Sequence, residues 1–400
     1  MEAQIAQITA VADQKEKIEK YKELINSRVK AGSGEELCEI VNHLTSEEVL
    51  QVVSRNVMTY FASVIKNDLS DREVFQEVAT YTLGKFQNQV VSFEDADYTL
   101  RDALFEHYLN EESFKSAANA LAGLNMESGS KVYTDAEKAN LYVKIAETYL
   151  EDDETDAAEN YVNRASGLMH SVENDWSLQL RYRVTYARVL DANRKFPEAA
   201  VRYHELSQTT AAEVVQDDLV ELLGKAVTCA LLGRAGPQRS RTLGALYQDE
   251  RTQGLPLAAH ADILAKMYTE QIIRPGNLTA FVESLMPHQK ALLGNGMTIP
   301  EAAALEHNMV ACARLYENIR LAELGVLLGI EADKAEKVAA KMITEGRLKA
   351  SIDQIEGILQ FEEDTNTMES WDDHISRICL TVNSCCESVV KSNPALADAF

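Results

Sequence analysis

The sequence predicts an all-α protein made of a tetratricopeptide-like helical-repeat solenoid, a winged-helix subdomain and a C-terminal helix. Three observations predict this fold class. Only seven of the 400 residues are proline and 18 are glycine, which favours helices because proline breaks helix interiors. The middle of the chain repeats with a period near 41 residues, and the tail carries a heptad pattern. We expect β-structure in the wing only.

Charge and cysteine usage limit the function classes. The chain has 39 basic and 63 acidic residues, a net charge of −24, which opposes a general role on nucleic acid or anionic membranes. A local basic patch would still attract such a partner despite the negative net charge. Six scattered cysteines without a Cys-x-x-Cys pair argue against a zinc finger and fit a reducing compartment. The charged N-terminus is unlike a signal peptide, and no apolar stretch is long enough for a membrane helix. We therefore expect an intracellular protein, and these features do not separate the nucleus from the cytosol.

The solenoid is predicted over residues 1–295. The first 30 residues are expected to form a helix, and the helical period continues through 35–44, 46–66 and 71–86. Further on, three units share an aromatic-or-valine plus leucine pair at 108/109, 149/150 and 189/190. Each unit then has a charged turn and an alanine pair, at 117, 157 and 199, that opens a second helix. Such a helical pair cannot bury its apolar face by itself, so we expect the units to stack.

A winged helix is predicted over residues 296–364. A helix over 301–317 would place one face inward, and a short strand at Ile319 and a helix over 321–328 would follow. The inward residues of the first helix are Leu305, Met309, Cys312, Ala313 and Tyr316. Asp333 is expected to cap the next helix with Glu336 in capping-box spacing, and Gly346 to end it. Strands around 348–353 and 357–362 complete the wing.

The tail, residues 365–400, contains the most regular pattern in the chain. Six residues spaced 4, 3, 4, 3 and 4 form the a and d positions of a heptad seam: Trp371, Ile375, Ile378, Val382, Cys385 and Val389. Asn366 supplies a helix start signal, and Asn393-Pro394 ends the pattern. The seam needs a helical partner, which is either the chain's own winged helix or a bundle formed with other chains.

Motifs that carry chemistry are absent from the sequence. There is no His-x-His, His-Glu-x-x-His, phosphate-binding loop or Gly-x-Ser-x-Gly, and the eight histidines are dispersed. The sequence therefore predicts no catalytic residue, no metal site and no cofactor. The chain is expected not to be an enzyme.

Two basic clusters are candidate binding surfaces. Arg239, Arg241 and Arg251 belong either to a salt-bridged helix pair or to an anchor for an acidic partner or for solenoid packing. In the winged helix the basic residues are Lys334, Lys337, Lys341, Arg347 and Lys349. Residues 331–349 hold five basic and four acidic residues, and the helix lacks the arginine or asparagine that reads bases. Protein contact is the preferred interpretation, and nucleic-acid binding is the alternative.

A helical-repeat array that ends in a winged helix is the layout of the PCI-domain family, whose members build the COP9 signalosome, the proteasome lid and a translation initiation factor. The chain resembles the signalosome members from about Val53 to Asn383. The PCI domain would span about 200–364. The resemblance rests on the runs 149–153, 163–166, 186–191, 194–196, 236–241, 249–251, 286–291, 305–308 and 352–357, and on Trp371. The proteasome lid remains an alternative, although Gln238-Arg239-Ser240-Arg241 and Met286-Pro287-His288-Gln289-Lys290 favour the signalosome.

The resemblance implies a function that residue patterns do not. The signalosome removes a ubiquitin-like modifier from cullins and so regulates cullin–RING ubiquitin ligases, and its isopeptidase is another subunit. This chain would be a non-catalytic scaffold. Its winged helix would join those of other subunits, its tail helix would enter a shared bundle, and its N-terminal repeats would reach the cullin-side substrate. Neither membranes nor nucleic acid are expected as partners.

Overall fold

The computed structural model describes residues 8–9, 13–46, 49–68, 71–87, 92–126, 133–172, 175–209, 215–254, 258–294, 296–361 and 367–392. The chain divides into two compact units, Met1–Arg194 and Lys195–Phe400. The domain boundaries suggested by the sequence, at 295 and 364, stay predictions. The helical-repeat and winged-helix fold class is confirmed.

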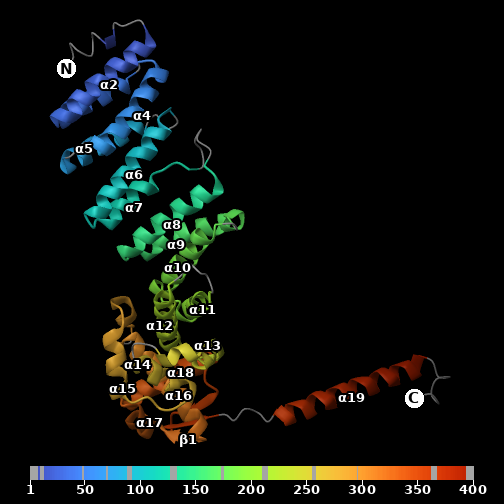
Figure 1. Ribbon diagram of the computed structural model, residues 1–400. Helices are drawn as coiled ribbons and strands as arrows, with labels where there is room; N and C mark the ends of the chain where they lie inside the picture. The colour runs from blue at the N-terminus through green and yellow to red at the C-terminus, as the bar shows by residue number, and fades with distance from the viewer. Residues whose placement is uncertain are drawn as a thin grey trace. The chain divides into compact units, whose positions relative to one another are not determined.

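The N-terminal unit consists of helices in its described residues (Figure 1). They are α2 (Gln14–Ala31), α3 (Gly34–Leu44), α4 (Gln51–Asp68), α5 (Arg72–Phe86), α6 (Glu94–Asn110), α7 (Phe114–Ala122), α8 (Asp135–Glu151), α9 (Thr155–Leu168), η2 (Met169–Val172) and α10 (Trp176–Ala192).

The C-terminal unit adds a small sheet to its helices. Its elements are α11 (Phe196–Ser207), α12 (Gln216–Leu232), α13 (Pro237–Gln248), η3 (Glu250–Gly254), α14 (Ala258–Tyr268), α15 (Pro275–Ser284), η4 (Pro287–Lys290), α16 (Ile299–Leu315), β1 (Asn318–Arg320), α17 (Leu321–Leu328), α18 (Ala332–Thr344), β2 (Ala350–Asp353), β3 (Ile358–Phe361) and α19 (Thr367–Ser392).

Alanine pairs open the second helix of each predicted repeat, as expected. Both alanines of the first and third pairs are buried, at the starts of α7 and α11, and Ala158 of the second pair is buried in α9. α6 packs on α7 and α8 packs on α9, whereas α11 packs on α12 inside the C-terminal unit. The division between the units therefore falls inside the third predicted repeat.

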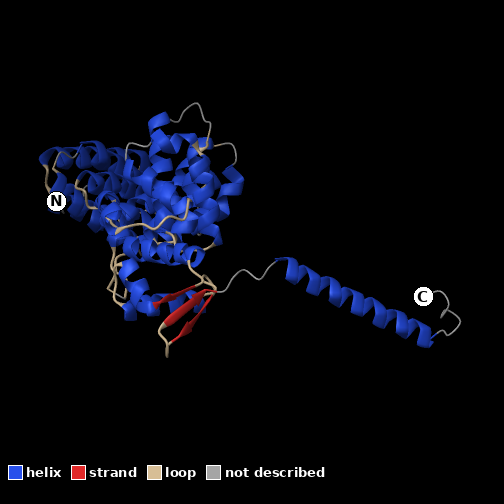
Figure 2. Cartoon of the chain, turned by 90° about the horizontal axis from the view of Figure 1, so that it is seen from below, coloured by secondary structure: helices blue, strands red, loops and turns tan. Residues whose placement is uncertain are grey.

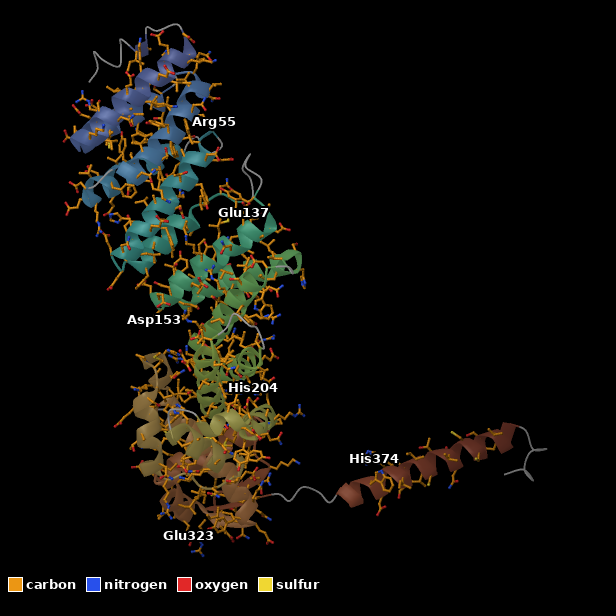
Figure 3. All side chains as sticks on the ribbon, in the orientation of Figure 1. Arg55, Glu137, Asp153, His204, Glu323 and His374 are labelled. Atoms are coloured by element: carbon orange, nitrogen blue, oxygen red, sulfur yellow. The ribbon has the colours of Figure 1, made fainter. Side chains whose placement is uncertain are left out.

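The turns between the repeat helices share one backbone conformation. Glu112, Asp153 and Arg194 have φ of 57°, 58° and 60°, and each lies two residues before the next helix. Around Asp153 (Figure 3), the N–H of Glu154 donates to the Tyr149 carbonyl at 3.0 Å. This bond closes a Schellman turn, which normally uses glycine at the left-handed position. The repeat is thus visible in the backbone as well as in the side chains.

The winged helix follows the predicted order of elements. β3 lies between β1 and β2 in an antiparallel sheet, drawn as red arrows in Figure 2. Leu324, Ala335, Met342 and Leu359 contribute to one apolar core beneath it. A Cβ at Gly325 would lie 2.8 Å from the Ile330 carbonyl oxygen, so only glycine lets α17 meet the start of α18 this closely.

Two details of the predicted winged helix are wrong. α16 ends at Leu315, and Tyr316 has extended backbone and is exposed, so it does not belong to the inward face. α18 begins at Ala332 after an extended Glu331, which places Asp333 in the first turn rather than at the cap. Glu336 accepts a bond from Gln354 Nε2 at 2.6 Å instead of completing a capping box.

Helix α19 runs over 26 residues and covers the whole predicted seam. The predicted start signal at Asn366 and the end at Asn393-Pro394 lie outside the described residues. The same holds for most of the first twelve residues, which were expected to be helical.

Candidate partner-binding surfaces

The heptad seam of α19 is exposed along its length. Trp371, Ile378 and Val382 keep 66%, 63% and 54% of their surface, and Ile375, Cys385 and Val389 are exposed as well. Figure 3 draws the side chains of this helix and labels His374 near its start. A continuous apolar stripe that is exposed to water is typical of a helix that binds other helices.

Leu380 is a further exposed apolar residue of α19 that the heptad pattern does not include. It keeps 68% of its surface and lies off the a and d positions. A single apolar residue outside a periodic pattern gives no sequence signal, so only its exposure draws attention to it.

The structure separates the three arginines of the first basic cluster. Arg239 of α13 is buried, and its Nη2 donates to the Met267 sulfur on α14 at 2.7 Å. Burial lowers the pKa of Arg239 to about 10, against the opposing influence of Glu306. Arg239 therefore lies in the core between helices and is not accessible to a partner.

Arg251 and Arg241 occupy different surroundings. Arg251 holds Asp249 with Nη2 at 2.7 Å from Oδ2, and its Nη1 donates to the Ser207 carbonyl at 2.6 Å. This ties η3 to the end of α11, and the hydrogen bond from Arg251 lowers the pKa of Asp249. His204, labelled in Figure 3, lies 3.7 Å from the same carboxylate. Arg241 is exposed on α13.

Arg347 holds the winged helix to the preceding helices. Its Nη1 lies 2.5 Å from Glu306 Oε2 on α16, and its Nη2 lies 2.5 Å from Glu345 Oε2. Glu306 Oε2 also accepts the N–H of Ala235 at 3.2 Å, between α12 and α13. Arg347 and Glu306 are each only 13% exposed. The sequence pattern indicates that Arg347 belongs to a basic surface. In the structure it is paired instead with Glu306, 41 residues earlier in the chain, and with Glu345, two residues earlier.

The lysines of α18 remain at the surface. Lys334, Lys337 and Lys341 are exposed, and Lys334 lies 3.4 Å from Glu331. Ala335, Ala339 and Met342 on the opposite face are buried. The helix therefore presents lysines outward, as its pattern predicts.

Within the described ranges, no three His, Cys, Asp or Glu side chains are grouped closely enough to bind a metal ion. His307 donates its Nε2 proton to the Gln271 carbonyl at 2.9 Å, and burial lowers its pKa to about 4. Across that same part of the chain, no helix is both long and apolar enough to cross a membrane.

Two family models match the chain in succession. The model described as "PSMD12/CSN4, N-terminal" matches residues 2–217, and the model described as "PCI domain" matches residues 260–363. The second match covers the described winged helix and the helices before it. Helical repeats followed by this winged helix define a protein of the PCI-domain class.

Curated relatives are similar over nearly their whole length. COP9 signalosome complex subunit 4 of Arabidopsis thaliana is 39% identical over 396 residues, covering 98% of each chain. The protein of the same name from Dictyostelium discoideum is 38% identical over 97% of this chain and 96% of its own. The Drosophila melanogaster protein is 40% identical over 96% and 93%. The chain belongs to the family of COP9 signalosome complex subunit 4.

Proposed function

We propose that this chain is a non-catalytic scaffold subunit of the COP9 signalosome. The observation that carries the proposal is the match to relatives of that name over nearly the full length of both chains. The chain itself is not an enzyme. The complex would remove a ubiquitin-like modifier from cullins, and so regulate cullin–RING ubiquitin ligases, through an isopeptidase on another subunit.

The partners of the proposed scaffold follow from its parts. The exposed seam of α19 supports entry into a helical bundle with other subunits, because an apolar stripe of this length is unfavourable in water. The winged helix would join the winged helices of neighbouring PCI subunits. The N-terminal repeats would reach the cullin–RING substrate and take part in sensing it. The complex would work in the nucleus and the cytoplasm, without contact to membranes.

Nucleic-acid binding is the second candidate function, and two observations weigh against it. Arg347, the one arginine of the proposed basic face, is paired with Glu306 and Glu345. The turn of the wing carries Asp353 and Glu356, whose charges repel a phosphate backbone. The proteasome lid is the other alternative, since one matching family model covers both groups by its description. The curated relatives favour the signalosome.

Native purification tests the proposed function. Tagged chain is recovered from lysate, its partners are identified by mass spectrometry, and the eluate is assayed for cullin deconjugation. We expect signalosome subunits and deconjugating activity. Recovery of the chain by itself, or with proteasome or ribosomal components, would overturn the assignment.

The double change Ile378→Asp with Val382→Asp tests the seam. Two charges placed in a buried helix contact should weaken association by roughly 100-fold or more, because desolvation costs several kcal/mol per ion. The readout is co-elution with the other subunits. The matched control, Ser376→Asp with Asn383→Asp, adds the same charge at exposed positions off the seam and should still co-elute. Unchanged co-elution of the seam variant would contradict the proposal.

A further inference from the structure

The end of α16 leaves two large apolar side chains in water. Leu315 keeps 66% of its surface and Tyr316 is exposed as well, although the same helix buries Met309 and Cys312 two turns and one turn earlier. Tyr316 has extended backbone and leads through Glu317 into β1. Neighbouring exposed apolar residues of this size are typical of a surface that another segment covers.

Two further exposed rings belong to α13 and α14. Tyr247 and Tyr268 are both exposed, and their rings stack with centroids 4.5 Å apart. Glu270 follows Tyr268 by two residues, and its Oε2 lies 2.5 Å from Arg314 Nε. This ion pair holds the turn after α14 against the last turn of α16. We call the four exposed residues on its two sides the apolar surface: Tyr247, Tyr268, Leu315 and Tyr316.

Only a short connection separates this surface from α19. The N–H of Phe361, the last residue of β3, donates to the Glu317 carbonyl at 2.8 Å, so β3 ends beside the residue that follows Tyr316. Helix α19 begins six residues later, at Thr367. Six residues span at most about 21 Å when fully extended, so the start of α19 lies within that reach of the apolar surface.

The length of the connection favours one occupant of the apolar surface. A segment tethered this closely has an effective concentration on the order of millimolar at its target. A second copy of the chain in a micromolar solution is about a thousandfold more dilute. The seam of α19 is itself apolar and exposed, so it has the chemistry that the surface needs. The seam of the same chain is therefore favoured over a second copy.

We propose that, in the chain without partners, α19 folds back and places the first part of its seam on the apolar surface. Trp371 and Ile375, one turn apart, cover Leu315 and Tyr316. Later seam residues extend the contact toward Tyr268. This contact is autoinhibitory, because it hides the seam until a helix of another chain displaces it. The proposal concerns the free chain and holds whether or not the scaffold assignment does.

The fluorescence of Trp371 tests the contact in the full-length chain. The chain has two tryptophans, so Trp176→Phe leaves Trp371 as a single reporter on the seam. Without partners, we expect blue-shifted emission and weak quenching by acrylamide. Adding Leu315→Asp with Tyr316→Asp should shift the emission to the red and raise the quenching constant about threefold, because two charges would enter a contact that excludes water. Dilution should leave the emission of the parent unchanged, since the contact forms within one chain.

The matched control is Val326→Asp with Ile355→Asp, which adds the same charge at two almost fully exposed apolar residues of the winged helix. It should leave the emission of Trp371 unchanged, and circular dichroism checks that every variant is folded. A water-exposed Trp371 in the parent, or an equal change in the control, would overturn the proposal. Protection that is lost on dilution would assign the seam to a second copy and overturn it too. Co-elution with other subunits tests the proposed function separately, because this experiment contains no partner.

Discussion

Two parts of the molecule hold their helices together in different ways. In the hairpin of α8 and α9, the contact is made by apolar residues such as Ile145, Ala158 and Val162. The ion pair from Glu147 of α8 to Arg181 of α10 is partly exposed. Around α16, the contacts include Arg239, His307 and Asn308, all buried, and the pair of Arg347 with Glu306.

This difference predicts where single substitutions should have a large effect on stability. A buried polar group is costly unless its partner is present, whereas an exposed ion pair contributes little. The helices around α16 should therefore depend strongly on individual residues and on pH. The repeat hairpin should respond weakly to changes in its charges, because apolar burial supplies its stability.

The largest expected effect is from Arg347→Ala. Removing the guanidinium leaves Glu306 largely buried without its charge partner, which should destabilise the α16–β2 region by about 3 kcal/mol. Hydrogen exchange of peptides from α16 and from β2 measures it. The matched control Arg181→Ala removes an exposed pair with Glu147 and should cost less than about 1 kcal/mol in α8 and α10. Equal destabilisation in the two variants would show that the largely buried ion pair is no more important than the partly exposed one.

Lowering the pH should have a smaller effect on the stability of the helices around α16. The pKa of His307 is lowered to about 4 by burial, from an unfolded value near 6.5. Between these values the unfolded chain binds more protons, so stability is full above about pH 6.5 and falls as the pH drops. By pH 5 the loss should be about 2 kcal/mol. Burial also lowers the pKa of His260, which adds in the same direction.

Hydrogen exchange at pH 6.5 and pH 5, corrected for the intrinsic rate, separates the two regions. Helices α14 to α16 should lose protection while α8 and α9 change little. The variant His307→Gln keeps a group that can donate to Gln271 and should reduce the pH dependence. An unaltered pH dependence in that variant would exclude His307 as its source.

The smallest expected effect is at the repeat turn. Asp153 has φ of 58°, a conformation that costs a residue with Cβ about 1 kcal/mol relative to glycine. Asp153→Gly should stabilise the α8–α9 hairpin by about 0.5 kcal/mol, because the larger entropy of unfolded glycine offsets part of the gain. Thermal unfolding measures it. Asp152→Gly, at φ −100°, is the control and should not stabilise.

Much of the architecture could be predicted from sequence because helical periodicity is a local property. The stripe Phe75, Val78, Ala79, Thr82 and Phe86 is buried in α5 as expected, and the alanine pairs open their helices. The ends of helices are harder to predict from sequence. A shift of one or two residues at a helix end leaves Tyr316 outside α16 and places Asp333 in the first turn of α18 and not at its cap.

The candidate surfaces show the same difference between features that local spacing predicts and features that it does not. The α19 seam could be read from sequence, because a heptad involves only residues three and four apart. The partners of the arginines could not. Arg239, Arg241 and Arg251 lie close in sequence, yet one is buried against Met267, one is exposed and one holds Asp249 and Ser207.

By itself, the sequence determined the helices, their repeat, the order of elements in the winged helix and the apolar stripe of the tail. All of these follow from spacing along one chain segment. The tertiary structure alone decided which charges are buried in pairs. Arg347 is paired with Glu306 from a helix 41 residues away, while Lys337 and Lys341 remain exposed on α18. Side-chain pairing depends on which helices meet and on where water is excluded between them. The spacing of residues along one segment encodes neither of these.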